Sequence, residues 1–150
     1  MDGASVAKRV PQPNRLGVRG WVYAGRYSFE RYLYLLHRLT GVGLVVYLLI
    51  HIIETGQRTR GPETWEGLMA LFATPAFKLL EFTLFAAFVY HALNGIRLAA
   101  TELGFFLGQP RPPVYPYPSS VRRHRPLTYF MMVLAAVVLA LGGFSFLSSW

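Results

Sequence analysis

The chain has 150 residues, of which 53% are hydrophobic and 15% are charged, and its formal net charge is +8. This balance excludes an ordinary soluble domain, because a soluble protein of this size needs more polar surface. The absence of cysteine excludes iron–sulfur ligation, disulfide bonds and any covalent attachment through a thiol.

Three apolar stretches are long enough to cross a membrane, whose hydrocarbon core of about 30 Å needs roughly 20 helical residues. They run from about Tyr32 to Ile53, from Ala76 to Ala100 and from Leu127 to Ser148. We therefore predict an all-α membrane protein with three transmembrane helices in an up-down-up bundle. Residues 1–31 form the predicted N-terminal segment, and residues 32–150 form the three-helix anchor domain.

A shorter apolar segment separates the first and second spans. Trp65 to Phe72 is apolar on one side and precedes Pro75. This segment is too short to cross the hydrocarbon core. We predict a short helix that lies at the membrane interface.

Charged residues set the expected orientation of the spans. Basic residues gather before the first span and between the second and third, and such loops stay on the cytoplasmic side. The N-terminus is therefore expected to be cytoplasmic. The charges flank membrane spans without base-stacking or zinc motifs, which favours contacts with anionic lipid and subunits over nucleic acid. The basic residues are Lys8, Arg9, Arg15, Arg19, Arg26, Arg31, Arg111, Arg122, Arg123 and Arg125.

The N-terminal segment also bears on localisation. It has no short apolar core followed by a small-residue cleavage site, so the first span is expected to remain in the mature protein. Asp2 together with Pro11 and Pro13 favours an unstructured tail over a mitochondrial transit peptide. An integral protein of a bacterial or archaeal plasma membrane is therefore favoured over one of the mitochondrial inner membrane.

His91 lies deep in the second span, within the run Phe88–Leu98. Ionisable side chains in hydrocarbon are costly unless they are paired or coordinated. A neutral imidazole shielded from water is a suitable iron ligand, and in a chain without cysteine a haem must be held by histidine or methionine. We therefore predict that His91 ligates the haem iron of a b-type cytochrome.

Two more histidines lie in the first span. His37 and His51 are fourteen residues apart, or four helical turns, so they share one face and differ in depth by about 21 Å. His91 is expected within several Å of the depth of His37, because the second helix runs antiparallel to the first. His51 lies at the opposite end, where it either ligates a separate, second haem or is an interfacial residue without a metal. His37 sits at the polar edge beside Arg38, and we assign it to the haem propionates rather than to the metal.

Two polar residues follow His91 in the second span. Asn94 is expected to make an interhelical hydrogen bond. Arg97 is expected to be a membrane anchor or a partner of a haem propionate.

The string His37-Arg-Leu-Thr-Gly41 in the first span, the later string His91-x-x-x-Gly95-Ile-Arg97 and the three-span layout resemble the cytochrome b membrane-anchor subunit of succinate:quinone oxidoreductase. The resemblance covers roughly residues 30–105. It implies that His91 is an axial ligand of haem b, that His37 lies by the propionates, and that Arg38 borders a pocket for ubiquinone or menaquinone.

The same resemblance implies partners and a role. The partners are a flavoprotein, an iron–sulfur protein and a second membrane anchor. Succinate would be oxidised on the flavoprotein, and this chain would dock the soluble subunits and pass electrons to quinone as the substrate. Many members have a serine three residues before the His-Arg pair that helps to hold the quinone. This chain has Tyr34 there, which can still donate a hydrogen bond but fills far more space.

Two alternatives belong to other functional classes. In one, the chain is a haem-free structural anchor whose histidines bond one another across helices. In the other, it is the cytochrome b anchor of a different membrane dehydrogenase. An absorption spectrum distinguishes the first alternative, and the identity of the co-purifying subunits distinguishes the second.

Overall fold

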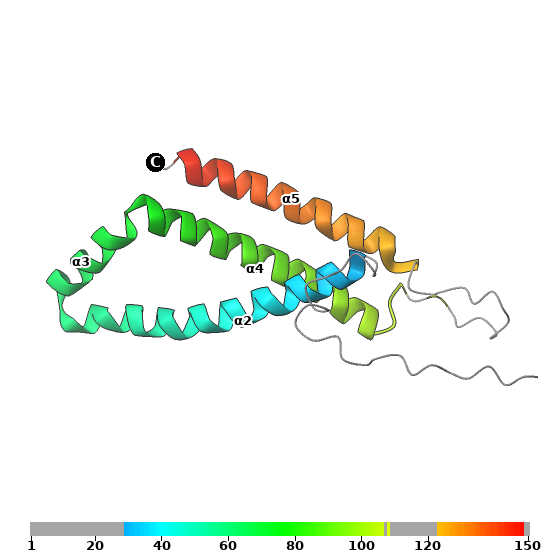
Figure 1. The fold of residues 1–150 in the computed structure, drawn as a ribbon, viewed down its shortest axis with the longest axis horizontal. Helices are drawn as coiled ribbons and strands as arrows, with labels where there is room; N and C mark the ends of the chain where they lie inside the picture. The colour runs from blue at the N-terminus through cyan, green and yellow to red at the C-terminus, as the bar shows by residue number, and fades with distance from the viewer. Residues whose placement is uncertain (1–28, 107, 109–122, 149–150) are drawn as a thin grey trace, which may run out of the picture. The chain divides into compact units, whose positions relative to one another are not determined.

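The computed structural model describes residues 29–106, 108 and 123–148. These residues form four α-helices and a short 3₁₀-helix, and they contain no strand, which confirms the all-α prediction (Figure 1). In chain order the elements are α2 (Phe29–Gly56), η1 (Gln57–Arg60), α3 (Pro62–Phe72), α4 (Pro75–Glu102) and α5 (Arg125–Ser148).

The three long helices confirm the predicted spans. Helices α2 and α4 have 28 residues each and α5 has 24, so each extends over roughly 36–42 Å and exceeds the hydrocarbon thickness. Large apolar side chains are exposed along all three, as expected for helices that face lipid or other subunits. The acidic Glu30 in the first turn of α2 favours a helix start at Phe29, three residues before the predicted Tyr32.

The short helix predicted between the first two spans is α3. It begins at Pro62, earlier than expected, because proline suits the first turn of a helix and Glu63 follows it there. Gly61 turns the chain from η1 into α3 with a φ of 109°, a value that side chains with a Cβ rarely adopt. Most of the predicted N-terminal segment, residues 1–28, lies outside the described residues.

Helices α4 and α5 run side by side (Figure 1). The ring of Phe82 lies 5.6 Å from that of Phe146. Phe85 packs directly over Gly142, where a Cβ would collide with the ring. A glycine at this position lets the two helices approach closely, as small residues do in membrane bundles.

The described residues divide into two units between Leu35 and Leu36. The helical contacts described here lie within the second unit. There, α2 and α4 meet near His37 and His91, and they diverge toward α3 (Figure 1).

Candidate functional site

Helices α2 and α4 contact one another through a pair of stacked imidazoles. The rings of His37 and His91 are 4.0 Å apart and within 5° of parallel. The two rings lie at one depth, as the antiparallel helices predict. Because stacked rings do not point their nitrogens at one another, this arrangement cannot ligate one haem iron from opposite sides.

A glycine on the facing helix makes room for each ring. A Cβ on Gly41 would lie 2.8 Å from Cε1 of His91, and a Cβ on Gly95 would lie 3.6 Å from Cε1 of His37. Each helix therefore contributes a histidine and, four residues later, the glycine over which the other helix's histidine lies. We call this place, where α2 and α4 meet through two histidines and two glycines, the crossing. The repeated H-x-x-x-G spacing is its signal in the sequence.

His91 is held by a hydrogen bond across the helices. Its Nδ1 lies 3.1 Å from the main-chain carbonyl oxygen of His37 and 3.3 Å from Oγ1 of Thr40. A carbonyl oxygen can only accept, so Nδ1 of the neutral ring carries the proton. The lone pair then lies on Nε2, which is the arrangement seen in metal-binding histidines whose other ring nitrogen donates to a carbonyl.

His37 has a different hydrogen-bonding state. Its Nδ1 is buried and has no hydrogen-bond partner among the described residues. A buried ring nitrogen without a partner is costly, so this atom is a place where a ligand or a neighbouring subunit would add a bond.

A groove runs along this crossing on the surface of α2. Its volume is about 380 Å³, and it is bordered by His37, Arg38, Gly41 and His91 together with three valines. Arg38 is exposed at the groove, where a guanidinium can bind an oxygen atom of a ligand. The exposed side chain of Tyr34 belongs to the other compact unit, and its role at a quinone stays a prediction.

Arg97 joins α4 to α5. Although it is charged, it is 5% exposed, and its Nε donates to Oδ1 of Asn94 at 3.0 Å. Its Nη1 donates across the helices to Oγ1 of Thr128 at 3.3 Å, and that hydroxyl donates to the carbonyl of His124. The expected interhelical bond of Asn94 is therefore wrong in detail: Asn94 binds Arg97 on its own helix, and Arg97 crosses to α5. The role of Arg97 at a propionate stays a prediction.

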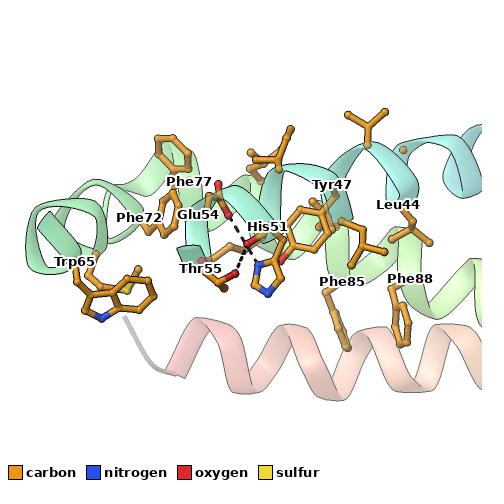
Figure 2. A pocket seen from close by; sticks show the side chains of 18 residues that line it. Leu44, Tyr47, His51, Glu54, Thr55, Trp65, Phe72, Phe77, Phe85 and Phe88 are labelled. Carbon is orange, nitrogen blue, oxygen red and sulfur yellow. Dashed lines mark hydrogen bonds and ion pairs between the residues drawn. The ribbon is translucent and has the colours of Figure 1, made fainter. Parts of the chain in front are cut away.

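His51 lies apart from these residues, in a larger cavity where α2 and α4 diverge. The cavity has a volume of about 970 Å³, at the upper end of the range for ligand pockets. Figure 2 shows its wall, to which all three surrounding helices contribute aromatic side chains. These side chains are Tyr47 of α2, Trp65 and Phe72 of α3, and Phe77, Phe85 and Phe88 of α4.

The polar partners of His51 also lie on its Nδ1 side. Nδ1 is 3.4 Å from the hydroxyl of Tyr47 and 3.9 Å from a carboxylate oxygen of Glu54 (Figure 2). A nearby carboxylate favours a proton on Nδ1, which leaves Nε2 as the ligating atom. Gly43 also lines the cavity, and a Cβ added there would meet nothing within 4 Å. A flat molecule therefore has room beside it.

Neither site contains three or more metal-ligating side chains from the described part of the chain. Among the described residues, no group of three or more His, Cys, Asp or Glu side chains is placed to bind a bare metal ion. Each site has one imidazole whose Nδ1 is partnered and whose Nε2 is left for a metal, His91 in the first site and His51 in the second. One such ligand suits a metal that brings most of its own ligands, as a porphyrin does.

Comparison with known proteins adds to this geometry. The family model for the succinate dehydrogenase/fumarate reductase transmembrane subunit matches residues 22–142, which include the first two spans, most of the third and both histidine sites. The chain belongs to this family. It is therefore an integral membrane protein of the anchor type, and the resemblance seen in the two histidine motifs is confirmed at the level of the family.

Two relatives are similar over part of the chain. The succinate dehydrogenase 2 membrane subunit SdhC of Mycobacterium tuberculosis is 36% identical over 62 residues, which are 41% of this chain and 46% of the relative. The succinate dehydrogenase hydrophobic membrane anchor subunit of Halobacterium salinarum is 35% identical over 79 residues, which are 52% of this chain and 61% of the relative. The matched segments span about half the length of these relatives.

Proposed function

We propose that this chain is the cytochrome b anchor of a succinate dehydrogenase complex, that it holds haem b through His91, and that it lends Arg38 to the site of quinone reduction. The observation that supports this most directly is the fixed tautomer of His91, whose Nδ1 faces the carbonyl of His37. An imidazole so held presents Nε2 to a metal. The plasma membrane of a bacterium or archaeon, with the N-terminus in the cytoplasm, is the proposed location.

The residues present fit a haem that is shared with another subunit. The ring of His91 is covered on one face by His37 and at its edge by Gly41, while a metal binds in the ring plane at Nε2. The groove at the crossing is open to the surface of this chain. A second anchor subunit would close it and supply a further ligand to the metal.

Each residue of the crossing then has its own task. A bound haem supplies one-electron transfer between the iron–sulfur subunit and quinone. His91 would hold and orient it, and the carbonyl of His37 accepts the hydrogen bond from Nδ1 of His91. Arg38 stabilises negative charge on a quinone carbonyl oxygen as electrons arrive, because a guanidinium stays charged and donates hydrogen bonds in a fixed geometry. The proposed place of His37 is beside the propionates, where its unpartnered Nδ1 finds a partner.

The cavity around His51 supports a second haem site in this chain. We propose that His51 ligates a second haem b, because its Nδ1 is partnered by Tyr47 and Glu54 and its Nε2 is left for iron. The aromatic wall and the open space over Gly43 suit a flat, apolar macrocycle.

Affinity purification of the tagged chain from mild detergent tests the proposed complex. We expect a flavoprotein, an iron–sulfur protein and a second anchor to co-purify, and the reduced sample to show a b-type absorption band. Recovery of a different dehydrogenase would support the alternative anchor function. A succinate dehydrogenase complex without that band would support the haem-free anchor.

Replacing Arg38 by leucine tests the quinone site. We expect quinone reduction by succinate to fall by about 100-fold, the usual cost of removing a group that stabilises developing charge. Electron transfer from succinate to a soluble artificial acceptor should stay intact, because the flavin lies on another subunit. Arg60→Leu in η1 removes the same charge far along the chain and should leave both activities unchanged. Equal loss of both activities in Arg38→Leu would indicate failed assembly and contradict a quinone role.

A further inference from the structure

We propose that Thr40 is a positioning residue for His91: its hydroxyl oxygen and the carbonyl of His37 together keep the proton on Nδ1 and so aim the Nε2 lone pair at the haem iron. The inference rests on the proposed haem site and extends it to a hydroxyl on the first span. It assigns a function to the threonine inside the H-x-x-x-G segment of α2.

The hydrogen bonds of Thr40 set the direction of its hydroxyl. Oγ1 lies 2.8 Å from the carbonyl oxygen of Leu36 and 3.0 Å from that of His37. Both carbonyls only accept, so the hydroxyl hydrogen points to the helix backbone. The oxygen lone pairs then remain for Nδ1–H of His91, at 3.3 Å.

The alternative tautomer is unfavourable in these surroundings. With the proton on Nε2, the Nδ1 lone pair would face the carbonyl oxygen of His37 at 3.1 Å without a hydrogen between them. Thr40 alone could turn its hydroxyl toward Nδ1, but it would then give up its bond to the backbone, and the carbonyl would still repel. Two acceptors on α2 therefore oppose loss of the Nδ1 proton.

The geometry also limits where the ring can move. A Cβ on Gly41 would come within 2.8 Å of Cε1 of His91, so the ring already lies against the backbone of α2 next to Thr40. His37 covers one face of the ring at 4.0 Å. The hydrogen bonds at Nδ1 fix the remaining rotation of the ring and hence the direction of Nε2.

Thr83 provides a matched comparison within the chain. Threonines inside helices commonly bond the carbonyl one turn earlier without any further role, and Thr83 does so to Leu79 at 2.8 Å. Thr40 makes the same bond but also meets His91 on the neighbouring helix. Thr83→Val therefore removes a local hydroxyl bond alone, whereas Thr40→Val removes that bond and the acceptor for His91.

The test compares Thr40→Val, Thr40→Ala, Thr40→Ser and Thr83→Val in the intact purified complex. Haem retention is measured during dilution in detergent, and the midpoint potential is measured by redox titration of the b-type band. We expect Thr40→Val and Thr40→Ala to weaken haem binding about 10-fold, the lower end of the effect of losing a partner of a metal-bound histidine. Their midpoint potential should become more positive, because a less basic imidazole stabilises ferric iron less. Thr40→Ser and Thr83→Val should behave like the unmodified complex.

Three results would overturn the inference. These are unchanged haem retention and potential in Thr40→Val, shifts of equal size in Thr83→Val, and failure of both Thr40→Val and Thr40→Ala to assemble with the other subunits, which would make Thr40 a folding residue. A complex that keeps its full b-type spectrum after loss of the His91 imidazole would refute the haem site itself, and so separates that failure from failure of the Thr40 role.

Discussion

The His91→Ala complex is expected to lose one haem b per flavin completely. His91 is the single histidine of α4, and its Nδ1 is bonded to the carbonyl of α2 so that Nε2 is the atom left for iron. Alanine removes the ligand and leaves a space over Gly41 that the imidazole had filled. The measurement is the reduced-minus-oxidised absorption spectrum of the purified complex, with the haem content normalised to flavin.

Two controls separate loss of a ligand from loss of structure. His37→Ala removes the stacking partner at 4.0 Å but should keep the same number of haems, because His37 is assigned to the propionates. Free imidazole added to His91→Ala should enter the vacated space and restore part of the band. An unchanged spectrum in His91→Ala would refute the assignment, as would a complete loss of haem in His37→Ala with full retention in His91→Ala.

The three spans were predictable because length and composition suffice for them. A run of about 20 apolar residues has few other uses, and α2, α4 and α5 contain the predicted stretches almost residue for residue. The depth of a side chain along a helix is equally predictable, because the rise per residue is constant. That is why His37 and His91 were expected at one level and do lie at one level.

The rotation of each helix about its axis could not be predicted in the same way. In a soluble helix the apolar stripe marks the buried face, but helices that are apolar all round carry no such mark. The stacking of His37 on His91 and the bond to Thr40 depend on that rotation. The repeated H-x-x-x-G spacing was visible, yet the sequence does not say that each glycine faces the other helix's histidine.

The buried hydrogen bond between Arg97 of α4 and Thr128 of α5 was not predicted, for a related reason. Thr128 lies in the third predicted span, and threonine is common in membrane helices. Thr128 matters because its hydroxyl accepts a hydrogen bond from Arg97, a buried residue five positions before the end of α4. A buried arginine needs several acceptors. Two acceptors of Arg97 are Asn94 on α4 and Thr128 on α5, which is thirty-one residues away from Arg97.

The two histidine sites differ in how closely α2 and α4 approach one another. At His91 the helices approach until imidazoles and glycines touch, which leaves only a shallow groove for a neighbouring subunit to complete. At His51 the same helices have diverged, and α3 closes the end of a cavity of about 970 Å³. Since His51 lies fourteen residues beyond His37, about 21 Å along α2, one haem cannot be bound by both His91 and His51.

The isolated complex is therefore expected to contain two haem b groups per flavin. His51→Leu should reduce that number to one and leave the haem at His91 in place, because leucine keeps the apolar volume of the cavity wall but offers no ligand. Tyr47→Phe removes only the hydroxyl 3.4 Å from Nδ1 of His51 and should keep both haems while altering the midpoint potential of one. Haem and flavin are counted by extraction, and the two haems are resolved by redox titration.

Two haems at these depths would form a path for electrons across the bilayer, whereas a single haem at His91 would serve the cytoplasmic quinone site alone. Each haem would then need a second ligand from outside this chain, because His37 is stacked beside His91 and His124 lies just before α5. The second anchor subunit should accordingly contribute one histidine to each. A ratio of one haem per flavin, unchanged in His51→Leu, would refute the second haem, and His51 would then be a structural residue bonded to Tyr47 at the end of α2.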